Sequence, residues 1–412
     1  MRFGRGGAHP RGPVVARQGR RRLRRPGLTL TRHYLDHAST SPPRPEVVAA
    51  LLSVLGPAAP VLGDPGRIHE EGRRSRVVVE EAREAVAAFL GTRPRQVVFT
   101  SGGTEAVNAA VWGAGRARPG GVGVLAAVEH SSVRDAARRA GDVVALGVDG
   151  VGRLDPGEVE AVLAGTRGEG PGVALVHCQL ANHEVGTLQP VAAVAEVCRR
   201  HGAALHVDAC AGAGHVPVAL DELGADLVSV SAHKLGGPAG VGALVVRRGL
   251  RIEPLLVGGD QERARRAGAE NVAAVVGFGA AAGVLGDPAR LAAEAGRARR
   301  HSGALLEAAR AVPGVTVLGD PEDRVPHIVC VAVHGVEAEA VLLGLDRAGV
   351  AAHSGSACSS ESLAPSPVLE AMGADAERSL RLSVGWSTTD DDVAAFAAAF
   401  PAVVAGLRAL GG

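Results

Sequence analysis

Lysine is almost missing from this chain, and aromatic side chains are scarce. Among 412 residues there are 44 lysines and arginines, and only one of them, Lys234, is a lysine. Aromatics make up 2%, so we expect a core of Ala, Val and Leu. Surface lysines tolerate replacement by arginine, but an amine that must form a Schiff base with an aldehyde does not, because a guanidinium stays protonated. Unless Lys234 survived by chance, it predicts a covalently bound aldehyde cofactor.

Cysteines are also few, and their number is odd. The five include no C-x-x-C pair, which argues against a disulfide framework and a zinc site and favours a reducing cytoplasm. The formal net charge of +1 gives no general attraction to nucleic acid or membrane. No apolar run reaches the roughly 18 residues of a membrane helix. We therefore expect a soluble cytoplasmic protein with no bound metal, membrane or nucleic acid.

The first 27 residues differ from the rest, since they are rich in Arg and Gly and have no apolar segment typical of a secretory signal. A nucleic-acid arm, a transit segment, a wrongly chosen start codon and a disordered leader all fit this composition, and we expect the disordered leader.

Short apolar runs alternate with helical patterns through most of the chain, which predicts an α/β fold with a mostly parallel sheet covered on both faces. A long Ala-rich helix over residues 272–312 is expected to lead to a smaller α+β domain. The predicted division is a leader (1–27), a segment joining the small domain (28–45), a large domain (46–271) and a small C-terminal domain (272–412).

Polar side chains follow several predicted strands, at the sheet edge where ligands of such folds gather. Residues 100–105 (TSGGTE) form a glycine-containing turn that opens a helix, so Gly103 and Thr104 are candidates for a phosphate site, although Thr104 also fits an ordinary helix cap. Asp208 is suited to a protonated ring nitrogen, and His130 to stacking on the ring; a cap and a structural histidine are the alternatives. With Lys234, these residues compose a pyridoxal phosphate pocket.

The order and spacing of these motifs resemble those of the class V, fold type I pyridoxal phosphate enzymes, and specifically the IscS/NifS-type cysteine desulfurases. The resemblance covers nearly everything after the leader, and its motifs are residues 34–40, 100–105, 129–130, 182–186, 206–209, 231–234, 258–263, 354–358 and 379–383.

The resemblance implies a seven-stranded sheet in the large domain and a role for each matched residue. Lys234 would hold the cofactor and act as acid and base, with Asp208 on the ring nitrogen and His130 stacked on the ring as a further catalytic residue. The phosphate would be bound by Gly103, Thr104, Ser231 and His233, with His183 also touching the cofactor. The substrate would contact Arg381, Asn182 and His183.

Cys358 is the residue that separates a desulfurase from an aminotransferase. It lies in a run of small polar residues, 352–362, that is typical of an exposed loop, whereas the other four cysteines lie in or beside apolar runs. The resemblance implies that Cys358 takes sulfur from L-cysteine as a persulfide, leaves L-alanine, and passes sulfur to acceptor proteins for iron–sulfur assembly or tRNA thiolation. It also implies a homodimer with the sites near the interface. The alternatives are a selenocysteine lyase or other class V enzyme, and a non-catalytic homologue.

Three positions depart from the family pattern. Where the family has Asn, Gln and Thr, this chain has His183, Ala211 and Ala269. His183 can donate a replacement hydrogen bond, whereas the two alanines cannot. Since one such bond is worth about 0.5–1.5 kcal/mol net, we expect a divergent member with altered cofactor affinity or substrate range.

Overall fold

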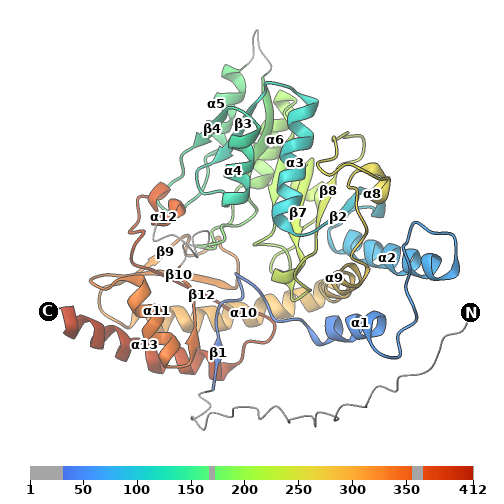
Figure 1. Ribbon diagram of the computed structural model, residues 1–412. Coiled ribbons are helices and arrows are strands. Elements are labelled where there is room, and N and C mark those ends of the chain that lie inside the picture. The colour runs from blue at the N-terminus through green and yellow to red at the C-terminus, as the bar shows by residue number, and fades with distance from the viewer. Residues whose placement is uncertain (1–30, 167–171, 355–364, 412) are drawn as a thin grey trace, which may run out of the picture. The chain divides into compact units, whose positions relative to one another are not determined.

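The short apolar segments form a seven-stranded sheet in a computed structural model, which describes residues 31–166, 172–354 and 365–411 (Figure 1). The strand order is β2-β8-β7-β6-β5-β3-β4, and β8 runs antiparallel to both of its neighbours while the other pairs are parallel. The predicted mostly parallel, seven-stranded sheet is confirmed. The strands are β2 (Val97–Thr100), β3 (Val122–Ala126), β4 (Val143–Leu146), β5 (Val173–His177), β6 (Leu205–Asp208), β7 (Leu227–Ser231) and β8 (Gly242–Val246).

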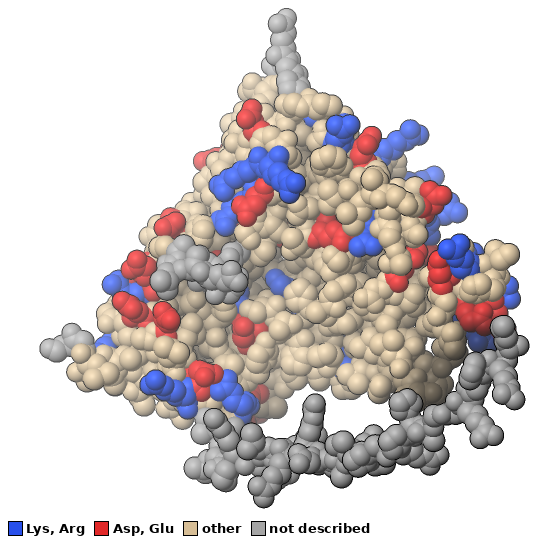
Figure 2. All heavy atoms as spheres, viewed as in Figure 1, with Lys and Arg blue, Asp and Glu red and all other residues tan. Residues whose placement is uncertain are grey.

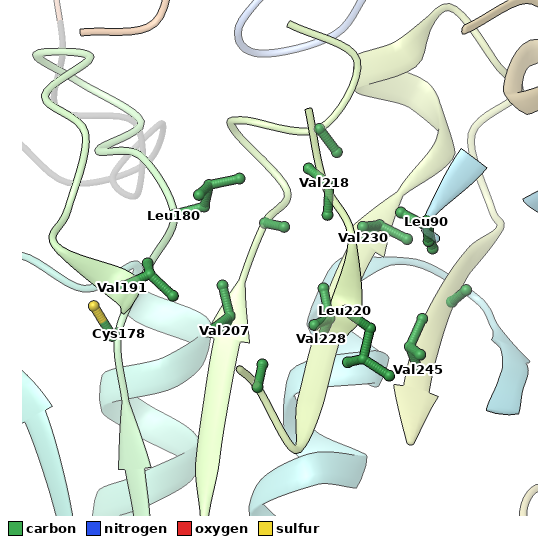
Figure 3. Packing of buried hydrophobic residues seen from close by; sticks show 14 of the residues in the cluster. Leu90, Cys178, Leu180, Val191, Val207, Val218, Leu220, Val228, Val230 and Val245 are labelled. Carbon is green, nitrogen blue, oxygen red and sulfur yellow. The ribbon is translucent and has the colours of Figure 1, made fainter. Parts of the chain in front are cut away.

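Alternate residues along these strands enter two separate cores. Val98, Leu227 and Leu244 pack with Ala-rich α3 on one face, and their neighbours Val97 and Val228 enter the largest core on the other. This follows from the two-residue period of a strand. Figure 3 shows the tight packing of Val207, Val230 and Val245 with Leu220 and Leu90 in that largest core. Small aliphatic residues thus fill the interior, as the composition predicted.

Helices cover both faces of the large sheet, and in Figure 1 α3 and α4 lie in front of it. Several helices begin where the sequence supplies a cap: His130 accepts from Ser132 N before α4, and Asp155 accepts from Gly157 N before α5. The helices are α1 (Pro45–Leu55), α2 (Glu70–Phe89), α3 (Gly103–Ala117), α4 (Ser131–Ala140), α5 (Pro156–Gly165), α6 (Val191–His201), α7 (Leu220–Leu223), α8 (Gln261–Ala264) and α9 (Val272–Leu285), with 3-10 turns η1 (Pro94–Gln96) and η2 (Ala232–Leu235).

A second core is built mainly from C-terminal elements around two small sheets. A three-stranded antiparallel sheet has the order β12-β10-β9, and β1 pairs in parallel with β11, which brings Leu35 into this core. The elements are β1 (His33–Tyr34), α10 (Pro288–Arg310), β9 (Val315–Leu318), β10 (Ile328–Val333), α11 (Ala338–Arg347), β11 (Val350–Ala351), α12 (Pro367–Ala371), β12 (Ser379–Ser383) and α13 (Asp390–Gly411). The described residues from Arg32 onward form one compact unit, and the domain boundaries stay a prediction.

The prediction of a single helix over residues 272–312 is wrong. Helix α9 ends at Leu285, and α10 starts at Pro288 after a bend of 83°. Asp287 caps α10 by accepting from Ala289 N, and Pro288 cannot continue the preceding helix. As a result α9 packs on α1 and α2 in the largest core, while α10 packs on β9 and β10.

One helix in the described part of the chain, α13, is long and apolar enough to cross a membrane by length and composition. Phe396, Phe400 and Val404 of this helix are fully buried in the second core. Its apolar character is therefore partly explained by packing.

Candidate active site

A cavity of about 260 Å³ opens at the carboxyl ends of the central strands. It collects residues from distant parts of the chain, including nine of the predicted site residues. These nine are Gly103, Thr104, His130, His183, Asp208, Ser231, His233, Lys234 and Arg381. The rule that ligands gather at this edge of a parallel sheet therefore located the cavity.

Lys234 lies in η2, immediately after β7, and its side chain reaches the cavity. The turn ends at Gly236, whose φ of 76° is a left-handed conformation that glycine adopts without strain. A Cβ at Gly236 would also lie 2.7 Å from Arg44 Cγ. The glycines that follow Lys234 and Leu235 thus allow the sharp turn that directs the Lys234 amine to the cavity.

The turn between β2 and α3 brings Gly103 and Thr104 to the cavity wall at a helix N-terminus. A Cβ on Gly103 would come within 2.6 Å of Cys210 Sγ, so only glycine fits without movement of the Cys210 side chain. The first backbone N–H groups of a helix have no partner in the helix and favour anions. This wall is therefore suited to a phosphate group.

Asp208 and Ser231 end the neighbouring parallel strands β6 and β7, and both line the cavity. Asp208 is 8% exposed, and its Oδ1 accepts from Cys210 N at 2.9 Å. The Oγ of Ser231 is buried and has no partner in the described part of the chain. Because an unpaired buried hydroxyl costs free energy, Ser231 is suited to a ligand atom.

His130 has a defined tautomer. Its Nδ1 accepts from Ser132 N at 3.1 Å, so the neutral ring carries its proton on Nε2. Burial, assisted by His183 and Lys234, lowers the pKa of His130 to about 3. The ring therefore stays neutral at physiological pH, as a group that stacks on another ring requires.

His183 meets His130 edge to face, with ring centroids 4.9 Å apart. It is 4% exposed, and its buried Nε2 has no hydrogen-bond partner among the described residues. Burial lowers the pKa of His183 well below its ordinary value. A neutral ring with an unpartnered nitrogen on the cavity wall fits a cofactor or substrate oxygen.

Asn182 does not line the cavity. Its Oδ1 accepts from the backbone N–H groups of Glu184 and Val185, both at 2.9 Å, and its Nδ2 donates to Val128 O. The side chain therefore holds the turn that presents His183. Its contact with substrate stays a prediction.

Arg381 is almost fully buried, at 1% exposure, yet its guanidinium lines the cavity. One nitrogen donates to Asp36 Oδ1 at 2.9 Å and to Ser39 Oγ at 2.6 Å, and another donates to His183 O at 2.9 Å. Its Nε is buried and has no hydrogen-bond partner among the residues that the structure describes. The fork is thus held in one orientation and keeps capacity for a carboxylate.

Several lining residues were not among the predicted site residues. Gln179 and Cys210 lie just past the ends of β5 and β6, and Ser39 lies in the N-terminal motif, so the strand-end rule could have found the first two. Burial and the charge of Asp208 raise the pKa of nearby Glu129 to about 8, and burial raises that of Glu184 to about 7. Sequence reasoning gave no signal for these two shifts, which arise from packing.

Cys358 lies outside the described residues, but the chain on either side of residues 355–364 is tied to the site. His353 and Arg381 exchange backbone hydrogen bonds of 3.1 and 2.7 Å. On the other side, Ser366 donates to Glu184 Oε2 at 2.5 Å. The two anchors lie next to Arg381 and His183, which both line the cavity.

Comparisons with known proteins agree with this geometry. The family model "Aminotransferase class-V" matches residues 33–396. "Cysteine desulfurase IscS 1" of Archaeoglobus fulgidus is 37% identical over 92% of this chain and 98% of its own length, and "Cysteine desulfurase" of Cereibacter sphaeroides is 38% identical with the same coverages. The solved NifS-like protein of Rickettsia africae superimposes with a TM-score of 0.80 at 28% identity, covering 90% of this chain and 99% of that one.

Proposed function

Because the chain belongs to the class-V aminotransferase family and, within it, to the cysteine desulfurases, we propose that it removes sulfur from L-cysteine with pyridoxal phosphate as cofactor. The observation that carries the proposal is one cavity lined by Lys234, Asp208, His130 and Arg381, with the helix N-terminus at Gly103 on its wall. Each of these side chains comes from a different part of the chain. Because this family depends on pyridoxal phosphate, we assign that cofactor to the cavity.

The residues present fit this cofactor. Ser231 Oγ, buried and unpartnered, lies with Gly103 and Thr104 where a phosphate would be bound, and His233 completes this wall. Lys234 would hold the aldehyde carbon, Asp208 the ring nitrogen, and the neutral His130 the ring face. When bound, pyridoxal phosphate supplies an electron-withdrawing ring that stabilises negative charge on the carbon beside the substrate amine.

The chain's own groups would orient the substrate and carry its protons. The Arg381 fork, fixed by Asp36 and Ser39, would hold the substrate carboxylate, and His183 would donate or accept at the unpartnered Nε2. Lys234 would move protons at the substrate carbons, and Nε2–H of His130 is available as a second donor. In the net reaction, sulfur leaves L-cysteine for the thiol of Cys358, which becomes a persulfide, and L-alanine is released.

Chain length allows Cys358 to reach this site. It is the fifth residue after His353, and five extended residues span at most roughly 18 Å. His353 is paired with the backbone of Arg381, whose side chain would hold the substrate.

The test is a combined sulfide and alanine assay with L-cysteine, pyridoxal phosphate and a reductant. We expect wild-type protein to release both products and Cys358→Ala to release neither at the wild-type rate. Cys198→Ala, which changes a buried cysteine on α6 away from the cavity, is the matched control and should retain activity. Full turnover by Cys358→Ala would refute the sulfur-transfer role. Turnover of L-selenocysteine alone would favour a selenocysteine lyase, and absence of any product would favour a non-catalytic homologue.

We also propose a cytoplasmic homodimer that passes its sulfur to acceptor proteins. Support for the dimer comes from large apolar side chains left exposed around α1 and near α3, a feature typical of interfaces. They include Leu52, Leu55, Val61, Ile68, Trp112 and Val257. On the face in Figure 2, positive and negative side chains are interspersed. This face therefore shows no large patch of one charge that would indicate a different kind of binding surface there. Light scattering after size exclusion tests the dimer; a monomer at micromolar concentration would refute it.

A further inference from the structure

The segment around α8 has an unusual backbone. Glu262, Arg263 and Ala264 have φ values of 49°, 59° and 59°, and they are the only non-glycine residues with positive φ in the described ranges. Side chains with a Cβ rarely adopt this conformation, and three in succession persist only when surrounding contacts enforce them. Such strain tends to lie at functional sites, so the contacts that maintain it indicate what it does.

The first contact is a buried ion pair that joins this strained turn to α2. Glu262 receives two hydrogen bonds from Arg83, at 2.7 and 2.8 Å, and both side chains are at most 4% exposed. The same carboxylate accepts from Phe99 N at 2.9 Å. Phe99 is the residue before Thr100, where β2 ends. Glu262 thus binds the backbone of β2 directly before the turn that leads into α3.

The second contact reaches the other end of that turn. Arg266 donates to both carboxylate oxygens of Glu105, at 2.9 and 3.2 Å. Glu105 in turn accepts from Ser101 N at 2.8 Å, which closes the turn on itself. Glu262 in the strained turn and Arg266 just after it therefore hold the two ends of residues 99–105, whose Gly103 and Thr104 line the cavity.

We propose that Glu262 and Arg266 form a clamp that positions the phosphate-binding turn, and that they act as its two positioning residues. This rests on the proposed function, because the phosphate belongs to pyridoxal phosphate. Neither residue lines the cavity. Both act through the backbone of residues 99–105, which must be held rigidly for its N–H groups to converge on one anion.

The test compares pyridoxal phosphate with pyridoxal, which lacks the phosphate, by spectrophotometric titration of the apo-protein. We expect Arg266→Ala and Glu105→Ala each to weaken pyridoxal phosphate by about tenfold or more, since hydrogen bonds to a charged group are lost, and to leave pyridoxal within about twofold. Arg263→Ala is the matched control: it removes an equal charge from the same turn, but its partner is exposed Glu80. Glu262→Gln should repeat the effect, and Arg266→Ala decides if Glu262→Gln does not fold.

The signs of the two effects separate positioning from simple electrostatics. A through-space charge effect would make Arg266→Ala weaker and Glu105→Ala tighter for pyridoxal phosphate, whereas loss of the clamp weakens both. Changes of opposite sign in the pyridoxal phosphate affinity of Arg266→Ala and Glu105→Ala would overturn the clamp alone. So would an unchanged ratio of pyridoxal phosphate affinity to pyridoxal affinity in both variants. A wild-type protein that shows no preference for pyridoxal phosphate over pyridoxal would overturn the proposed cofactor, and the clamp with it.

Discussion

The buried carboxyl of Glu129 makes stability depend on pH in a way that can be measured. Glu129 is fully buried beside Asp208; its Oε1 accepts from Gln179 N at 2.7 Å, and its Oε2 has no partner in the described chain. Burial, and then the charge of Asp208, raises the pKa of Glu129 from 4.5 to about 8. Between these two pH values the native protein therefore holds a proton that the unfolded chain has released.

The sign of the effect follows from this difference. Where the native state binds more protons than the unfolded state, stability falls as pH rises, so the loss begins near pH 4.5 and is complete above about pH 8. At 1.36 kcal/mol per pKa unit, Glu129 alone removes on the order of 5 kcal/mol across this window. Glutamine at this position mimics the protonated acid and removes the penalty. With an unfolding entropy of about 2.1 cal/mol/K per residue, the difference amounts to about 5 °C in Tm.

The assay is thermal unfolding of apo-protein from pH 5 to pH 9. Wild type and Glu129→Gln should melt together at pH 5, and the variant should melt about 5 °C higher at pH 9. The raised pKa of Glu184 affects both proteins equally and cancels. Glu84→Gln, at an exposed position on α2, should follow wild type throughout. Parallel curves for Glu129→Gln and wild type would refute the buried, protonated carboxyl.

Two further predictions concern the cavity wall. Gly103→Ala places a Cβ 2.6 Å from Cys210 Sγ, so it should weaken pyridoxal phosphate binding about tenfold. Cys210→Ala should restore much of the affinity in the double variant. Equal affinities in titrations of the single and double variants would contradict this steric reasoning. Arg381→Lys keeps the charge but loses the guanidinium fork that joins Asp36, Ser39 and His183 O. In initial-rate assays KM for L-cysteine should rise about tenfold or more, while pyridoxal phosphate affinity stays the same. An unchanged KM would exclude Arg381 from carboxylate binding.

Local sequence determined the large sheet because a buried strand needs only a short apolar run between turns. The observed strands at residues 143–146 and 242–246 of this sheet are such runs. The strand-end rule then located Asp208, Lys234 and Thr104 at one edge, since consecutive parallel strands place their carboxyl ends together. The solitary lysine predicted a covalently bound aldehyde cofactor, and the motifs around Thr104, His130 and Asp208 then predicted pyridoxal phosphate.

Other features depend on packing between segments far apart in the chain. Arg381 is held by Asp36 and Ser39, more than 340 residues away, and the strained turn at Glu262 is stabilised by Arg83. The raised pKa of Glu129 likewise exists only once the sheet buries it. None of these follows from local propensity, because each is a contact or a desolvation that the folded chain creates. The sequence alone determined the sheet, the lysine and the family; the tertiary structure decided how the arginine fork, the phosphate turn and the buried acids are held around them.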